Sequence, residues 1–375
     1  MYNRAIYPLL KHHLKPNKVC LLLGARRVGK TIILEKLTDD YPGKVTFLNA
    51  EDEDSAKLLE VKSVSNYKRL LNGTDLLIID EAQTLPDIGL KLKLIIDSIK
   101  GIKVIATGSS AFDILNLTGE PLTGRSFEVS LYPMSQLELS KTETLLETRQ
   151  NLEERLVYGS YPEVLTLENI SDKTDYLINL KSSYLLKDIL ILDGIRNSGK
   201  MYDLLRLLAY QVGSEVSYNE LGNSLGISKN TVEKYIDLLI KVFVLIKLGG
   251  FSNNLRKEIT KTHKFYFTDN GIRNALIGDF DFLSLRQDTG QLWENYFITE
   301  RIKFMSYSKK KCTYYFWRTY DQQEVDLIEV ENKTVRAFEI KWKPKKVKAP
   351  VFFSKSYPKA KFEVISPDNY LDFIS

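Results

Sequence analysis

Short apolar runs alternate with amphipathic or charged stretches over the first third of the chain. Five of these runs are short enough, and apolar enough, to be buried strands of a parallel sheet. Alternation of such strands with helices is typical of a doubly wound α/β sheet, so we predict an α/β domain over residues 1–135. The predicted strands are Val19–Leu23, Lys44–Asn49, Leu76–Asp80, Ile102–Thr107 and Phe127–Leu131.

The pattern becomes helical after residue 135. Residues 136–200 hold charged, helix-prone segments with apolar positions at helical spacing, which predict a helical connector. Within residues 201–285, a short helix, a glycine turn and a second helix that begins after Ser228 predict a helix-turn-helix. The runs Val242–Leu248 and Lys264–Thr268 then predict the hairpin of a winged helix.

Near the C-terminus, polar and apolar residues alternate with the period of two that strands have. The runs Glu324–Val330 and Thr334–Lys341 flank a turn signal at Asn332–Lys333, and a two-residue turn there fixes the register of a hairpin. Val325 would then lie on the face opposite Glu324, Asp326 and Glu339. We predict a small α+β domain over residues 286–375. The register gives three cross-strand pairs: Asp326 with Glu339, Glu324 with Lys341, and the opposite charges Glu329 with Arg336.

Composition places the chain among ordinary soluble proteins of two or three domains. Of its 375 residues, 43% are hydrophobic and 27% are charged, and the formal net charge of +5 is small for this length. Such a charge permits nucleic-acid binding without requiring it. The two cysteines, Cys20 and Cys312, predict no disulfide framework and suit a reducing cytosol. The first residues lack a signal-peptide core, and no apolar run approaches the roughly 20 residues of a membrane span, so we expect a cytoplasmic protein without a membrane partner.

The strongest chemical signal is a G-x-x-x-x-G-K-T run between the first predicted strand and a helix. Its glycines let backbone N–H groups turn toward the charged oxygens of a polyphosphate. Lys30 would reach the β and γ phosphates of ATP, and the Thr31 hydroxyl would hold Mg²⁺. Arg26 and Arg27 either add phosphate contacts or are solvated. The predicted nucleotide-binding residues of this loop are Gly24, Ala25, Arg26, Arg27, Val28, Gly29, Lys30 and Thr31.

Acidic and hydroxyl residues follow two of the other predicted strands. Asp80 and Glu81 end the third strand as a Walker B pair, in which Asp80 would reach Mg²⁺ directly or through water, and Glu81 would orient and deprotonate the attacking water. Thr107 or Ser109, at the tip of the fourth strand, would polarise that water, or Ser109 or Ser110 would cap the next helix. Arg125 would neutralise charge in the transition state, in cis or from a second copy in a homo-oligomer, or it forms a surface salt bridge.

The predicted C-terminal hairpin sets Asp326 beside Glu339, and two adjacent carboxylates repel each other unless a cation or a proton lies between them. A divalent ion fits, and Lys341 would position water or stabilise developing negative charge, which is the chemistry of metal-assisted phosphodiester cleavage. The alternative is a half-exposed hairpin with a charged solvent face. The lysines of the tail would track a phosphate backbone, or they belong to a solvated face or a protected edge strand. They are Lys341, Lys343, Lys345, Lys346, Lys348, Lys355, Lys359 and Lys361.

Five motifs, in this order, resemble a family of bacterial and archaeal AAA-type ATPases. They are Gly24–Thr31, Ile79–Gln83, Thr107–Ser110, Thr123–Arg125 and Gly159–Glu163. The resemblance covers nearly the whole chain and implies a P-loop ATPase of the additional-strand type, with Thr107 or Ser109 as its sensor residue. It also implies a C-terminal region of unknown function that is similar to a winged helix followed by a restriction-endonuclease-like fold.

Within that C-terminal region, Asp326, Glu339 and Lys341 resemble the D…ExK core of PD-(D/E)xK nucleases. Glu294, in the helical stretch Trp293–Lys303, resembles the extra acidic residue that the first helix of those folds supplies. The resemblance therefore implies a metal site formed by Glu294, Asp326 and Glu339.

DNA contact would come from the predicted winged helix, unless that module serves internal packing or protein contact. We predict an ATP-binding and ATP-hydrolysing protein that uses Mg²⁺ and associates with DNA. The second hypothesis is a nucleotide-dependent switch that binds protein partners and has a catalytically silent C-terminal fold. The residues predicted to enter the major groove are Lys229, Asn230, Thr231 and Lys234, and those predicted to contact phosphates are Arg256, Lys257, Lys261 and Lys264.

Overall fold

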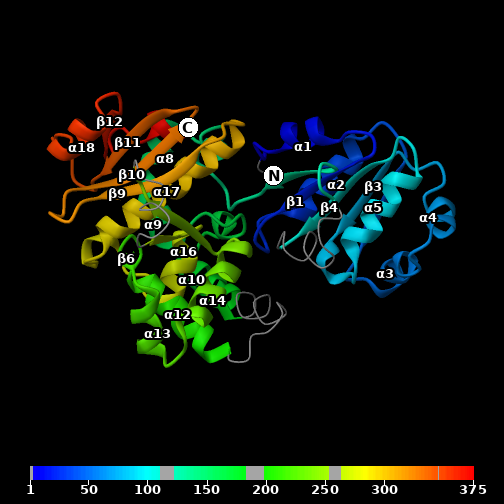
Figure 1. Cartoon of the computed structure of the whole chain (residues 1–375), viewed down its shortest axis with the longest axis horizontal. Coiled ribbons are helices and arrows are strands. Elements are labelled where there is room, and N and C mark those ends of the chain that lie inside the picture. The colour runs from blue at the N-terminus through cyan, green and yellow to red at the C-terminus, as the bar shows by residue number, and fades with distance from the viewer. Residues whose placement is uncertain (1–2, 110–121, 183–197, 253–262, 345) are drawn as a thin grey trace. The chain divides into compact units, whose positions relative to one another are not determined.

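The computed structural model (Figure 1) describes residues 3–109, 122–182, 198–252, 263–344 and 346–375. The chain divides into two compact units, one of residues 1–132 with 241–243, the other of residues 133–240 with 244–375. Among the described residues, no helix combines the length and the apolar character needed to cross a bilayer.

A five-stranded parallel sheet forms the centre of the first unit (Figure 1). The strand order β2-β3-β4-β1-β5 places β4 between the strand before the phosphate loop and the strand that ends in Asp80. This extra central strand is the additional-strand arrangement that the sequence predicts. Each predicted run forms one strand, with ends that differ by at most one residue. The strands are β1 (Lys18–Leu23), β2 (Val45–Asn49), β3 (Leu76–Asp80), β4 (Lys103–Gly108) and β5 (Ser126–Ser130).

Helices bury the central strands of this sheet. Every residue of β3 is buried, as expected for a parallel strand between two helical layers. Val19 and Leu21 of β1 share one core cluster with Leu92 of α5. The helices of the first unit are α1 (Tyr7–His13), α2 (Lys30–Asp40), α3 (Glu53–Glu60), α4 (Val64–Leu70), the 3-10 turn η1 (Ala82–Thr84) and α5 (Ile88–Ser98).

One seven-stranded sheet runs through the second unit in the order β12-β11-β10-β9-β7-β8-β6. The sequence predicts two modules that meet at residues 285–286, but this sheet includes strands of both. The junction is β7 with β9, where Gly249 pairs with Tyr315 in parallel register. Backbone pairing of this kind leaves no side-chain pattern in the sequence. The strands are β6 (Glu215–Val216), β7 (Leu245–Gly250), β8 (His263–Phe267), β9 (Thr313–Arg318), β10 (Glu324–Glu331), β11 (Thr334–Ile340) and β12 (Lys361–Ile365).

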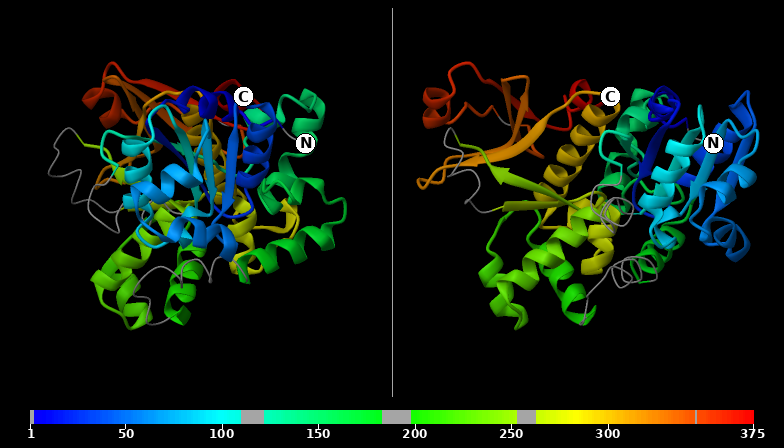
Figure 2. Two further views of the ribbon diagram at one scale, coloured as in Figure 1. Left: turned by 90° about the vertical axis from the view of Figure 1, so that its right-hand side faces the viewer. Right: turned by 45° about the vertical axis from the view of Figure 1, so that its right-hand side comes forward.

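Thirteen helical segments of the described residues surround this sheet. Figures 1 and 2 show α12, α13 and α14 (green) at the end of the unit away from α18 (red). The segments are α7 (Gln136–Leu139), α8 (Leu145–Gln150), α9 (Leu152–Tyr158), η2 (Val164–Thr166), α10 (Ile170–Leu180), α12 (Ser198–Tyr210), α13 (Tyr218–Leu225), α14 (Lys229–Lys241), α16 (Asn270–Ile277), η4 (Leu283–Leu285), α17 (Thr289–Tyr307), α18 (Val351–Ser356) and α19 (Leu371–Ile374).

The two helices and the turn of the predicted helix-turn-helix are present as α13 and α14. Gly226 ends α13 in the left-handed conformation, with φ of 65°, which glycine adopts without strain. Ser228 Oγ accepts a hydrogen bond from the backbone N–H of Thr231 at 3.1 Å and so caps α14. Strands β7 and β8 form an antiparallel hairpin, and β6 pairs with β8.

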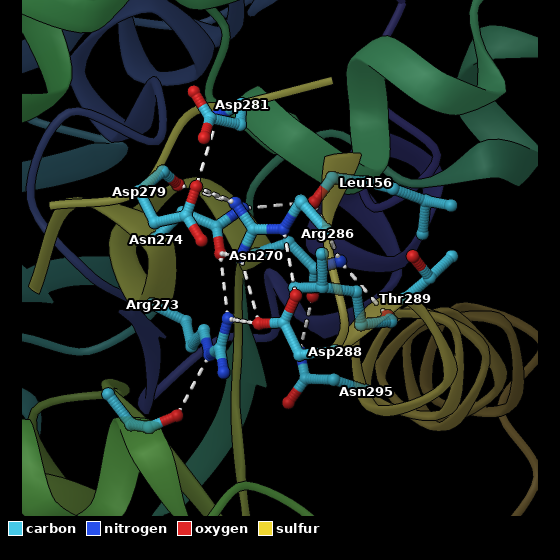
Figure 3. A network of polar contacts seen from close by, with 12 residues as sticks. Leu156, Asn270, Arg273, Asn274, Asp279, Asp281, Arg286, Asp288, Thr289 and Asn295 are labelled. Atoms are coloured by element: carbon cyan, nitrogen blue, oxygen red, sulfur yellow. Dashed lines mark hydrogen bonds and ion pairs between the residues drawn. The ribbon is translucent and has the colours of Figure 1, made fainter. Parts of the chain in front are cut away.

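A buried polar network fixes the start of α17 against α16 (Figure 3). Arg273 and Arg286 both donate hydrogen bonds to the carboxylate of Asp288. Asn295 Nδ2, nearly two turns into α17, donates to Asn270 Oδ1 of α16 at 2.6 Å. Buried polar groups of this kind are costly without partners, so the network fixes the rotation of the helix about its own axis.

Strands β10 and β11 pair in the predicted register, with Glu329 opposite Arg336. Asn332 and Lys333 have φ of 47° and 69°, as a two-residue turn with two left-handed positions requires. The Glu329 carboxylate nevertheless turns to the buried Arg301 of α17, at 2.6 and 2.9 Å. A buried carboxylate needs a partner in direct hydrogen-bond contact, and Arg301 supplies two donors.

The backbone pairing of this hairpin ends one step before Asp326 and Glu339. The backbone N–H of Ile340 donates to Asp326 Oδ2 at 2.7 Å, so a side chain takes the place of a backbone acceptor. A bulge in β10 places Val325 in the same apolar cluster as Ile328. The predicted face of Val325 is therefore wrong, because strict alternation does not hold across a bulge.

Candidate functional site

The phosphate loop joins the end of β1 to the start of α2. Gly24 lies against the backbone just after β5, and a Cβ there would come within 2.2 Å of the carbonyl oxygen of Leu131. Gly29 has φ of 93° and directly precedes α2. Both glycines are therefore required by the local geometry. The loop lies at the N-terminus of α2, where backbone N–H groups favour an anion.

Lys30 and Thr31 begin α2 and point to the residues around the loop. Lys30 Nζ donates to the carbonyl oxygens of Gly24 and Ala25, at 3.0 and 3.1 Å, and only 4% of its side chain is exposed. Thr31 Oγ1 donates to Asp80 Oδ2 at 2.8 Å. The structure thus brings the loop and the end of β3 into direct contact.

Thr107 connects the two acids at the end of β3. Its hydroxyl donates to Asp80 Oδ1 and accepts a hydrogen bond from the backbone N–H of Glu81 at 2.9 Å. Glu81 itself is left-handed, with φ of 51°, and its Oε1 lies 3.9 Å from Lys30 Nζ. Sequence reasoning missed Gln83, whose Nε2 donates to Glu81 Oε2 at 2.6 Å. Ser109 is buried just after β4.

Two arginines of the first unit pair with acidic side chains. Arg26 lies 3.7 Å from the carboxylate of Glu51. Arg125 precedes β5, and its carbonyl oxygen accepts a hydrogen bond from the N–H of Val19 at the start of β1. The phosphate loop follows the other end of β1, about 13 Å further along the strand. A cis role for Arg125 at the γ phosphate is therefore wrong, and its guanidinium pairs with Asp97 at 3.5 Å.

Sequence reasoning also missed Arg4, because it lies outside every motif. Its two terminal nitrogens donate to the carbonyl oxygens of Val28 and Tyr132, at 2.5 and 2.6 Å. Arg4 therefore connects the phosphate loop to Tyr132, which ends the first segment of this unit.

A second cluster of charged residues lies in the second unit, on α17, β8, β10 and β11. Lys341 Nζ lies 2.7 Å from Glu339 Oε1 and 3.7 Å from Asp326 Oδ2. These three residues lie together on one face as predicted, but Glu324, which the predicted register places opposite Lys341, pairs with Lys264 instead. Glu294, on α17, accepts a hydrogen bond from the Tyr266 hydroxyl at 2.6 Å.

Lys264 of β8 is also part of this cluster. Its Nζ donates to Glu324 and lies 3.9 Å from Glu294 Oε1, and the residue is only 3% exposed. The predicted contact of Lys264 with DNA phosphates is therefore wrong. Sequence reasoning missed its true place because 60 residues separate it from Glu324.

Burial sets the protonation of this cluster. Burial, with a smaller contribution from the charge of Asp326, raises the pKa of Glu294 to about 8. Burial also raises the pKa of Asp326 and of Glu339. Burial alone would lower the pKa of Lys264, but the surrounding carboxylates outweigh it and raise that pKa.

The predicted three-carboxylate metal site is not assembled in the described part of the chain: no group of three His, Cys, Asp or Glu side chains there is placed to hold a metal ion. Glu294 is held by Tyr266 and Lys264. Glu339 Oε2, by contrast, is buried and has no hydrogen-bond partner. Together with Asp326 it offers the carboxylate oxygens that Mg²⁺ prefers, so these two residues fit one divalent ion.

The residues predicted to read DNA differ in exposure. Lys229, Asn230 and Lys234 are exposed on α14, whereas Thr231 is half-buried. Arg256, Lys257 and Lys261 lie outside the described residues, as do Ser110 and Lys345. The other lysines predicted to track a phosphate backbone are exposed, apart from the half-buried Lys341.

The loop, the acids of β3 and the extra central strand define the first unit as a P-loop nucleotide-binding domain of the ATPase class. Residues 16–140 match the family model described as "AAA domain", which confirms the predicted AAA-type ATPase domain. Residues 149–283 and 289–366 match two models described as "Domain of unknown function", DUF8612 and DUF4143. The winged-helix and endonuclease-like assignments stay predictions.

Relatives cover most of the chain. An uncharacterized protein of Mycobacterium tuberculosis is 27% identical over 338 residues, which are 88% of this chain and 72% of that protein. An uncharacterized protein of Methanocaldococcus jannaschii is 24% identical over 339 residues, 85% of this chain and 74% of its own length. One solved structure that matches is a signal transduction ATPase with numerous domains, which has a tetratricopeptide repeat sensor and comes from Pyrococcus horikoshii. It has a TM-score of 0.30 and 13% sequence identity, and the match covers 82% of this chain and 48% of that protein chain.

Proposed function

We propose that the first unit binds ATP and hydrolyses it with Mg²⁺. The observation that carries the proposal is the continuous set of contacts from Thr31 through Asp80 and Thr107 to Glu81. Thr31 and Asp80 offer the hydroxyl and carboxylate oxygens that suit Mg²⁺, so the residues present fit the ion. Thr31 and Asp80 would hold the ion, which would supply positive charge to offset the charge that develops on the phosphates.

Each side chain has a distinct task in this proposal. The Lys30 ammonium exchanges its carbonyl partners for the β and γ phosphate oxygens. Glu81 orients the attacking water and accepts its proton. Gln83 and Thr107 hold Glu81 in place, one through its carboxylate and the other through its backbone.

Steady-state ATPase assays on Lys30→Ala and Glu81→Gln test the proposal. We expect Lys30→Ala to weaken ATP binding and Glu81→Gln to abolish turnover while leaving binding intact. Lys36→Ala, an exposed lysine on the same helix, is the matched control and should behave as the wild type. Undiminished turnover in both site variants would refute the proposal.

We also propose that the second unit binds DNA through α14. The order α12-β6-α13-α14-β7-β8, with a three-stranded antiparallel edge, supports a winged helix. Lys229, Asn230 and Lys234 supply exposed donors on α14 for phosphates and base edges. We expect affinity for duplex DNA to fall steeply with salt, and the salt slope to fall by about one unit in Lys234→Ala. Lys309→Ala, an exposed lysine remote in sequence from α14, is the control.

Metal-assisted phosphodiester cleavage is the second candidate function, favoured by the unsatisfied Glu339 Oε2. Asp326 and Glu339 would hold the ion, which supplies an activated water, and Lys341 would stabilise the charge that develops on the phosphate. Mn²⁺-dependent cleavage of DNA should disappear in Asp326→Ala and in Lys341→Ala. Absence of cleavage in the wild type would reject this function.

The outcome of the DNA-binding assay separates the proposal from its main alternative. If the wild type shows no DNA binding at low salt while its ATPase activity is intact, the protein is better described as a nucleotide-dependent switch for protein partners. In that case the second unit is the partner-binding part and its charged cluster is catalytically silent.

A further inference from the structure

The most unusual feature of the second unit is a buried lysine among carboxylates that belong to other segments. Lys264 comes from β8, in the hairpin next to the helix-turn-helix, whereas Glu294 comes from α17 and Glu324 from β10. The Lys264 ammonium also lies 5.4 Å from the centre of the Phe316 ring. A charge this deeply buried is strongly destabilising unless it is paired, so its position is fixed by its partners.

The charges of the cluster divide into two halves. Lys341 lies beside Asp326 and Glu339, and Lys264 lies beside Glu294 and Glu324. Each half therefore has two carboxylates and one ammonium. Adjacent carboxylates repel each other unless a cation or a proton lies between them, and both halves hold an ammonium. The two ammonium groups differ in exposure: 39% of the Lys341 side chain is exposed, so it can turn away from a bound ion, whereas only 4% of the Lys264 side chain is exposed and it stays in place.

A second residue of strand β8 also contacts Glu294. The Tyr266 hydroxyl, two residues along the same strand and on the same face, donates to Glu294 Oε1 at 2.6 Å. Gly213 closes the other side, because a Cβ there would lie 3.0 Å from the same oxygen. The contacts of Glu294 are thus made to this strand and its neighbours.

We propose that Lys264 is a resident cation that excludes divalent metal from the Glu294–Glu324 half of the cluster, and so restricts metal to Asp326 and Glu339. A divalent ion needs carboxylate oxygens at about 2.0–2.6 Å, and the ammonium lies where such an ion would have to sit. Two cations cannot share that position, because they repel each other. The exclusion itself does not need the cleavage activity, although restriction to Asp326 and Glu339 rests on the metal site proposed above.

Titration of the full-length protein with Mn²⁺, without nucleotide, tests the inference by calorimetry. We expect Lys264→Met to bind one more Mn²⁺ per chain than the wild type, because the carboxylates lose their ammonium but keep their places. Lys264→Arg keeps the charge and should gain no Mn²⁺. Lys264→Met combined with Glu324→Gln should lose the added site. Any Mn²⁺ held near Thr31 and Asp80 is common to all variants and cancels in the comparison.

Two results would overturn the inference. One is a folded Lys264→Met protein that binds no additional Mn²⁺. The other is a Glu324→Gln protein that binds one Mn²⁺ fewer than the wild type, because the wild type would then hold an ion in the half assigned to Lys264. If Lys264→Met is insoluble, refolding with and without Ca²⁺ decides: rescue by Ca²⁺ supports the inference and no rescue overturns it. Loss of cleavage alone would count only against the proposed nuclease function.

Discussion

Replacement of Thr107 by valine removes one hydroxyl from the centre of the ATPase site and keeps the shape of the side chain. Thr107 is fully buried, donates to Asp80 and accepts from the Glu81 N–H. A hydrogen bond to a charged acceptor contributes about 1.5–3 kcal/mol, and one between neutral groups about 1 kcal/mol. The Glu81 N–H keeps a longer contact with Asp80 Oδ1 at 3.2 Å, which offsets part of the loss. We expect the free energy of unfolding of the first unit to fall by about 2–4 kcal/mol.

The effect on catalysis follows from the same contacts. Without the hydroxyl, the left-handed Glu81 and the Asp80 carboxylate lose the group that sets their relative position. A loss of about 1.4–2.7 kcal/mol in positioning lowers kcat about 10- to 100-fold. The KM for ATP should change little, because Lys30 and the loop still bind the phosphates.

Urea unfolding and steady-state ATPase assays measure the two effects separately. Thr46→Val is the matched control: its hydroxyl contacts that of Thr74 at 2.8 Å in the same sheet, away from the acids of β3. The control should lose about 0.5–1.5 kcal/mol of stability and keep its kcat. A Thr107→Val protein with reduced stability and wild-type kcat would show that Thr107 only supports the fold.

Three further predictions concern single side chains. Gly24→Ala should weaken ATP binding at least about tenfold by calorimetry, because its Cβ would meet the Leu131 carbonyl at 2.2 Å; binding equal to the wild type would show that the loop tolerates the shift. Arg125→Ala should leave turnover unchanged at low protein concentration, since Arg125 lies at the opposite end of the strands from the loop, and a loss that appears only at high concentration would reveal an arginine supplied by a second copy. Burial, aided by the charge of Lys247, lowers the pKa of His263 to about 4, below the value of about 6.5 in an unfolded chain. The second unit should therefore lose stability as pH falls from 6.5 toward 4, and His263→Phe should flatten this slope in thermal melts; an unchanged slope would contradict the assignment.

The candidate sites show how far local sequence information reaches. The phosphate loop could be predicted because its chemistry needs fixed residue types at fixed spacing, and Asp80 and Thr107 because strand ends are visible as apolar runs that stop at polar residues. That Asp326, Glu339 and Lys341 share one face could be predicted because a two-residue turn fixes the register of the two strands. Gln83 could have been found as a polar residue two positions after Glu81, but Arg4 carries no local signal.

By itself, the sequence determined the five strands of the first unit, the glycine loop and the register of β10 with β11. These features depend on residue type and on neighbours only a few positions away. Only the tertiary structure decided that β7 pairs with β9, that Lys264 lies among the carboxylates of α17 and β10, and that Arg125 lies at the wrong end of its strand for a cis role. Strand order and buried ion pairs are formed between residues far apart in the chain, through backbone groups that every residue shares and charges that suit many partners, so no local pattern specifies them.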